Sequence, residues 1–205
     1  MVGLRLAAHQ KKARRQDAHI ALIDESGLLL APLLRRTWAP RGQTPDFVQH
    51  GGGGPRQKVS VAAALWLSPR RDRLGLYSKT LVNGYFDNWY VTAFLEAMMH
   101  DLDGRFVVVW DGGPMHKGDP IHQLTDHFAD RLCLESLPPW APMLNPTEPL
   151  WGWLKYDRLC NYAPHDAAEL DGRVVAELAA VKDDQQFLRA MYHASELPLP
   201  RALLF

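Results

Sequence analysis

The segment at residues 137–155 reads LPPWAPMLNPTEPLWGWLK, a proline-rich loop that leads into an apolar helix. Local rules predict where that helix begins. Asn145 is a good N-cap, Pro146 suits the first helical position, and Glu148 then occupies the third position. From there the Glu148 side chain can reach back to the backbone N–H of the N-cap residue and complete a capping box. On this interpretation Glu148 is a structural residue.

The same helix permits a second interpretation, in which Glu148 takes part in chemistry. Glu148, Trp151 and Lys155 follow the spacing i, i+3, i+7 and therefore point the same way. A carboxylate, a flat aromatic ring and a cation along one stripe suit a phosphodiester held near a metal ion. Capping and metal binding are compatible at the first turn of a helix, so the local sequence leaves both interpretations open.

The segments around this motif predict a single α/β domain. Apolar runs bounded by turn residues predict strands within 18–27, 28–45, 58–68, 73–83, 105–111 and 131–137. Helical spacing predicts helices at 87–100 with Asp87 as N-cap, at about 119–130, from Asn145 to about Cys160, and along a tail through 167–193. Several strands followed by alternating helix and strand favour a mixed sheet flanked by helices. We expect residues 1–17 to be a charged lead-in or linker and residues 18–205 to form the domain.

Acidic residues end two of the predicted buried strands. Asp24 and Glu25 end the first one, where Gly27 is expected to turn the chain, and Asp111 ends the run VVVWD. An acid at a strand end is often only a turn residue. Alternation along the first strand places Asp24 on one face and Glu25 on the other, so only one of them can enter a given site. Alternation alone does not decide which one.

The composition is that of an ordinary globular protein. The chain has 205 residues, of which 47% are hydrophobic and 22% charged, and its formal net charge is zero. No apolar run has the length of a membrane span, and no secretory signal pattern opens the chain, so we expect a cytoplasmic protein with no membrane partner. Cys133 and Cys160 lack the spacing of a zinc site and are expected to be reduced structural thiols.

Three segments together resemble a known family. LIDESG with RRTWAPRGQTP, VVVWDGGPMHKG, and LPPWAPMLNPTEPLWGWLK are similar to the catalytic domain of bacterial insertion-sequence transposases of the mariner superfamily, which are of the DDE type. The resemblance runs from about residue 15 to about residue 160, and the third segment is its most specific part. It implies an RNase H-like fold. Gly112 departs from the family pattern, because an asparagine often stands there.

The resemblance implies that Asp24, Asp111 and Glu148 are the catalytic and metal-binding triad, with Asp24 chosen over Glu25. Two magnesium ions, for which manganese can substitute, would activate water or a 3′-hydroxyl and stabilise the leaving oxygen. Carboxylate oxygens are the ligands that magnesium prefers. The implied activity is strand cleavage at the ends of a mobile element, followed by joining of the freed 3′-hydroxyl to target DNA.

The implied partner is double-stranded DNA, both element ends and target, bound by a homo-oligomer. His116 and Arg41 match positions of the family motifs, and the basic lead-in would add phosphate contacts that weaken with salt. The expected DNA-binding residues are Lys155, Trp151, His116, Arg41, Lys11, Lys12, Arg14 and Arg15.

Relatives carry helix-turn-helix modules ahead of the catalytic domain, and the residues that precede Asp24 are too few for one. We therefore expect this chain to correspond to the downstream half of a split transposase, fused to an upstream reading-frame product by frameshifting. A first alternative is a truncated binding or regulatory fragment that does not transpose. A second is an RNase H-like nuclease without strand transfer, and a third is a structural α/β protein whose acids only cap and turn.

Overall fold

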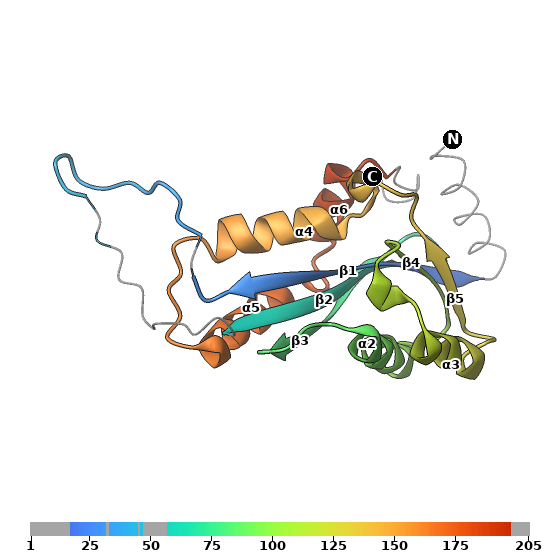
Figure 1. Ribbon diagram of the computed structural model, residues 1–205. Helices are drawn as coiled ribbons and strands as arrows, with labels where there is room; N and C mark the ends of the chain where they lie inside the picture. The colour runs from blue at the N-terminus through green and yellow to red at the C-terminus, as the bar shows by residue number, and fades with distance from the viewer. Residues whose placement is uncertain (1–16, 32, 45, 47–56, 198–205) are drawn as a thin grey trace.

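Five strands form one mixed sheet in the order β3-β2-β1-β4-β5 (Figure 1). The computed structural model describes residues 17–31, 33–44, 46 and 57–197. Within them, β1 pairs antiparallel with β2 and parallel with β4, while β2 and β3 are antiparallel and β4 and β5 are parallel. This is the predicted mixed sheet. The strands are β1 (Ala18–Leu29), β2 (Lys58–Leu67), β3 (Leu74–Val82), β4 (Arg105–Trp110) and β5 (Leu132–Ser136).

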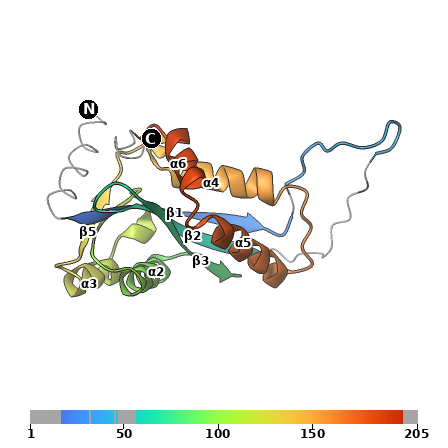
Figure 2. The ribbon, with the colours of Figure 1, turned by 180° about the vertical axis from the view of Figure 1, so that it is seen from behind.

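Helices cover both faces of this sheet, as the front and back views show (Figures 1 and 2). One face packs against α2 (Asn88–Asp101) and α3 (Asp119–His127). The other packs against α4 (Thr147–Trp153), α5 (Ala167–Val181) and α6 (Gln185–Ala194). Short turns of 3-10 helix, η1 (Pro114–His116) and η2 (Pro142–Leu144), precede α3 and α4. No helix in the described part of the chain has the length and apolar character needed to cross a membrane.

Alternation along β1 divides its side chains between the two apolar layers. Ile20 and Leu22 belong to the layer under α4, α5 and α6, whereas Ala21 and Ile23 belong to the layer under α2 and α3. The predicted alternation is therefore confirmed. It directs Asp24 toward the α4 side of the sheet and Glu25 toward the α2 side.

The predicted second strand within 28–45 is wrong. Leu28 and Leu29 continue β1, and residues 33–44 contain no helix or strand. Gly27 does not turn the chain, because it lies opposite Ser60 in an antiparallel ladder that β2 extends as far as Leu29. The expected Pro/Gly turn forms later, where the Gln43 N–H donates to the Pro40 carbonyl.

Most other predicted elements are present, with shifted ends. Asp87 caps α2, accepting a hydrogen bond from the Tyr90 N–H. The predicted helical tail is two helices, and Asp184 caps the second by accepting from the N–H groups of Gln186 and Phe187. The helix expected to reach Cys160 is α-helical through Trp153 and then widens into a π-helical turn, η3 (Leu154–Arg158).

Buried leucines hold α4 on the sheet. Leu150 and Leu154 are both 0% exposed and lie in the same apolar layer as Leu22 and Val109. Each buried leucine removes enough apolar surface from water to stabilise the fold by roughly 2 kcal/mol. Because Glu148 belongs to this helix, its position relative to β1 depends on that packing.

We expect Leu150→Ala to lower the free energy of unfolding by roughly 2–5 kcal/mol, because it leaves a cavity between α4 and the sheet. Urea denaturation measures this change. Val175→Ala is a matched control on α5, where the valine is 47% exposed, and we expect a change within about 0.5 kcal/mol. Equal losses in the two variants would contradict this account of how α4 is held.

Candidate active site

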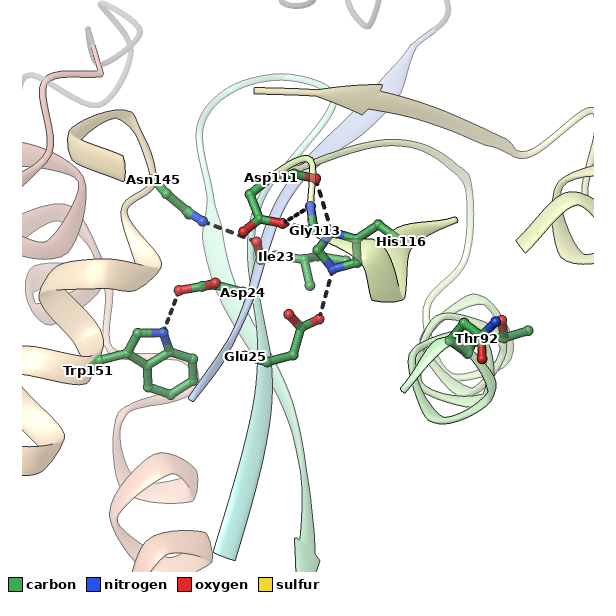
Figure 3. A network of polar contacts seen from close by, with 10 residues as sticks. Ile23, Asp24, Glu25, Thr92, Asp111, Gly113, His116, Asn145 and Trp151 are labelled. Atoms are coloured by element: carbon green, nitrogen blue, oxygen red, sulfur yellow. Dashed lines mark hydrogen bonds and ion pairs between the residues drawn. The ribbon is translucent and has the colours of Figure 1, made fainter. Parts of the chain in front are cut away.

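Asp24 lies on β1 and faces α4. Its Oδ2 accepts a hydrogen bond of 2.7 Å from the indole Nε1 of Trp151, which is 4% exposed (Figure 3). The spacing between Glu148 and Trp151 therefore does bring the indole into the site. It does so by orienting a carboxylate from another element.

Asp111 directly follows β4, beside the strand that carries Asp24. In the parallel pairing of the two strands, Leu22 is opposite Val109. Asp24, still within β1, and Asp111 each come two residues after that pair, so they lie beside each other where β4 ends. The Asp111 side chain is 61% exposed. Its Oδ1 accepts a 2.8 Å hydrogen bond from the Gly113 N–H.

Glu148 is exposed in the first turn of α4. Its negative charge adds to the effect of burial in raising the pKa of the Asp24 carboxyl group. The three acids, which are distant in sequence, thus belong to one region. Asp24 and Glu148 interact electrostatically, while the strand register brings Asp111 beside Asp24.

Asn145 caps α4, but the predicted capping box does not form. The Asn145 Oδ1 accepts from the N–H of Thr147 at 3.2 Å and from its hydroxyl at 2.7 Å. The Asn145 N–H donates to the Pro142 carbonyl and is not available to Glu148. Among the described residues the Glu148 carboxylate makes no hydrogen bond. The capping-box hydrogen bond on which the purely structural interpretation of Glu148 depended is therefore absent from this structure.

Asn145 also performs a role that sequence reasoning missed. Its Nδ2 donates a 3.1 Å hydrogen bond to the carbonyl of Ile23, the residue before Asp24, and the side chain is 3% exposed (Figure 3). The amide thus ties the start of α4 to β1 beside the acids. The residue type itself indicates that Asn145 makes a second contact. A cap uses only the side-chain oxygen of an asparagine, and a buried NH₂ group requires a partner of its own.

The pKa of Asp24 is raised to about 7. Burial is the largest cause, because a carboxylate loses hydration there. The hydrogen bond from Trp151 opposes the shift, whereas the charges of Glu148 and Glu25 add to it. The negative charges of Glu25 and Glu148 thus act on Asp24, and no cationic side chain among the described residues offsets them there.

The other predicted contact residues have different surroundings. His116 is buried, its ring stacked on Trp110 and its nitrogens facing Asp111 and Glu25. Burial lowers the pKa of His116, but its hydrogen bonds and the charges of Glu25 and Asp111 raise it overall. His116 and Trp151 are both buried in this structure, and their contact with DNA stays a prediction.

The predicted basic contacts divide into two groups. Arg41 is exposed in the turn at residues 40–43, and Lys155 is half-buried in η3. Lys11, Lys12, Arg14 and Arg15 lie outside the described residues. Contact of these side chains with DNA stays a prediction.

No three His, Cys, Asp or Glu side chains in residues 17–31, 33–44, 46 and 57–197 lie close enough together to enclose a metal ion. The possible metal ligands near the end of β4 are carboxylate oxygens, the type that magnesium and manganese bind. Mutual repulsion among Asp24, Glu25 and Glu148 is the condition that a bound cation relieves.

A mixed sheet with one acid within the central strand β1, a second just after the adjacent parallel strand β4, and a third on a helix that covers β1 is typical of a class of nucleases. The family model described as DDE superfamily endonuclease matches residues 19–171, and the chain belongs to this family. The resemblance drawn from the sequence is confirmed at this level. No curated protein sequence matches the chain significantly.

Solved structures of Mos1 transposase share the fold. The chain is similar to the Mos1 paired-end complex with left transposon end (TM-score 0.63, 16% identity, 94% of this chain and 56% of that one). It is equally similar to the Mos1 strand transfer complex (0.62, 16%, 94% and 56%). A Mos1 paired-end complex with Mg follows (0.59, 14%, 92% and 57%). The sheet with its flanking helices is thus the RNase H-like fold of that catalytic domain, and the chain spans a little over half the length of these proteins.

We expect Asp24→Asn to stabilise the protein at alkaline pH. The Asp24 pKa is about 7 in the fold against an ordinary 3.8, so the folded state holds a proton that the unfolded state has lost. Stability from this group is highest at low pH and falls as pH rises toward 7, and above 7 the buried charge carries its full penalty. In buffer without divalent cations at pH 8, thermal melts should place the Tm of the variant roughly 5 °C or more above that of the unaltered chain.

The pH dependence of this gain is its signature. The difference in Tm should shrink steadily toward pH 4, because Asp24 is then protonated in the folded state and already partly protonated in the unfolded state. Asp103→Asn, at an exposed turn, is the matched control and should show no pH-dependent gain. A constant offset at every pH would show that charge at Asp24 is not what destabilises the fold.

Proposed function

We propose that this chain is the catalytic domain of a transposase that cleaves DNA strands at the ends of a mobile element and joins the freed 3′-hydroxyl to target DNA. The proposal is supported by the place of Asp24 beside Asp111, within β1 and just after β4, and by the electrostatic interaction of Glu148 in α4 with Asp24, in a chain of the DDE superfamily endonuclease family. These three carboxylates are the proposed catalytic residues.

The same carboxylates would hold magnesium, or manganese in its place. The donor set fits these ions, since it consists of hard oxygen atoms and carries excess negative charge. When bound, the ions activate the attacking water or 3′-hydroxyl and stabilise the leaving oxygen. The solved Mos1 complex with Mg supports this assignment.

The remaining side chains of the site position these acids. The Trp151 indole holds Oδ2 of Asp24, and Asn145 fixes the start of α4 against Ile23. Glu148 stays exposed and without a hydrogen bond to any described residue, so its carboxylate is available to a ligand. A pre-arranged set of this kind lowers the cost of bringing water, phosphate and metal together.

DNA is the proposed substrate, both as element ends and as target. The Mos1 structures in question are complexes with a transposon end and of strand transfer, which supports this substrate class. Arg41 and Lys155 are proposed to contact phosphates, together with the basic residues before Asp17. We further propose that the working enzyme is a homo-oligomer on DNA and that a fused upstream helix-turn-helix product recognises the ends.

Cleavage without strand transfer, or regulation without cleavage, is the alternative function. The family description favours keeping it, because it names an endonuclease and not strand transfer. The two functions differ in one product. A transposase joins a supplied 3′-hydroxyl end to a second DNA, and the alternatives do not.

We expect Glu148→Gln and Asp111→Asn each to reduce magnesium-dependent nicking of supercoiled plasmid by at least roughly 100-fold, since each removes a charge that metal binding requires. Both side chains are exposed, so the thermal melts of the variants should stay close to that of the unaltered chain. Gel electrophoresis of nicked and supercoiled plasmid gives the rates. Glu96→Gln, on the exposed side of α2, is the matched control and should nick normally.

Nicking by folded Glu148→Gln at the unaltered rate would contradict the proposed triad. A supplied oligonucleotide carrying an element end separates the alternatives in the same reaction. Joined product supports the transposase, and nicking without joined product supports the nuclease. If the unaltered chain does not nick at all, fusion to the upstream module distinguishes an incomplete enzyme from a regulatory fragment.

A further inference from the structure

His116 lies between two carboxylates that come from different strands. It belongs to η1, and its side chain is 2% exposed. The ring Nδ1 is 2.8 Å from Oδ1 of Asp111 and 3.0 Å from the Asp111 carbonyl, while Nε2 is 3.2 Å from Oε1 of Glu25 (Figure 3). One imidazole thus connects the end of β4 to β1.

The plane of this imidazole is fixed by stacking. The rings of His116 and Trp110 lie 4.4 Å apart at an interplanar angle of 3°. Trp110 is itself 3% exposed in the layer under α2 and α3. Because the ring cannot tilt without losing this contact, the direction of both nitrogens is set by the sheet.

Glu25 supports the ring from the opposite side. Alternation along β1 keeps it away from the face that carries Asp24, and its side chain is 13% exposed. A carboxylate this buried requires a partner, and the partner it has is His116. Glu25 therefore has a different role from its neighbour Asp24.

The contacts of Asp111 are confined to one of its oxygens. Oδ1 accepts from the Gly113 N–H and faces His116, while Oδ2 has no hydrogen-bond partner among the described residues. Position 113 has no room for a side chain, because a Cβ there would lie 2.9 Å from Oδ1 of Asp111 and 2.5 Å from the sulfur of Met115. A side chain otherwise 61% exposed is therefore held in one orientation.

We propose that Glu25 and His116 are positioning residues for Asp111. They hold its Oδ1 so that its Oδ2 is presented, already oriented, to the divalent cation. This inference rests on the proposed function, because it takes Asp111 to be a metal ligand. Partners of this kind orient a ligand and typically change metal affinity by roughly 10–100-fold when removed.

The test measures manganese binding directly, by the electron paramagnetic resonance of free Mn²⁺ in titrations of the full 205-residue chain. His116→Phe keeps the stack on Trp110 and removes both nitrogens, and we expect it to weaken binding roughly 10–100-fold. His116→Asn restores a donor near the position of Nδ1 and should recover part of that affinity. Glu25→Gln leaves the ring in place and should weaken binding by a smaller factor.

Nicking kinetics supply the second measurement. If Asp111 is misoriented, the concentration of Mn²⁺ for half-maximal nicking should rise in His116→Phe, while the rate at saturating Mn²⁺ recovers most of its value. Glu96→Gln is again the control. Unaltered Mn²⁺ affinity and unaltered metal dependence in folded His116→Phe, or in Glu25→Gln should the former not fold, would overturn the proposal.

Asp111→Asn separates this proposal from the proposed function. If that variant loses Mn²⁺ binding while Glu25→Gln and His116→Phe bind normally, Asp111 is a ligand and the positioning role is wrong. If Asp111→Asn itself binds Mn²⁺ as the unaltered chain does, the triad fails, and the positioning role fails with it.

Discussion

The parallel pairing of β1 with β4 is the constraint on which the site depends. Leu22 lies opposite Val109, and two residues later each segment reaches an acid, Asp24 within β1 and Asp111 just after β4. Antiparallel pairing at this register would send the two ends in opposite directions and separate Asp24 from Asp111. Helix α4 adds the third acid, and its place over β1 follows from Leu150, Leu154 and the hydrogen bond from Asn145 to Ile23.

The two faces of β1 explain why two acids stand side by side in the sequence. Asp24 points to the α4 face, where Trp151 orients it and where burial, together with neighbouring negative charge, raises its pKa. Glu25 points to the α2 face and meets His116, which in turn contacts Asp111. Asp24, Glu25 and Asp111 thus each have one carboxylate oxygen held by a neutral or cationic donor. Burying these carboxylates lowers the stability of the fold at this site, and a bound cation would offset that loss.

Much of this arrangement was predictable from local sequence. Alternation along residues 20–25 assigned the faces of β1, and the cap at Asp87 followed from residue type. The differences had both distant and local causes. Gly27 was expected to turn the chain, but β2 pairs with it and extends the strand. The capping box does not form because the Asn145 N–H donates to the nearby Pro142 carbonyl. The contact between His116 and Glu25 was not predicted, because the two residues are 91 positions apart.

The central claim is that Asp24, Asp111 and Glu148 bind divalent cations together. Crystals soaked in manganese, with anomalous diffraction measured near the manganese absorption edge, test it most directly. The account predicts an anomalous peak beside Asp24 in β1 and the carboxyl end of β4, within about 2.5 Å of carboxylate oxygens of Asp24 and Asp111 and facing Glu148. A strong peak elsewhere on the molecule, with none between these acids, would contradict it.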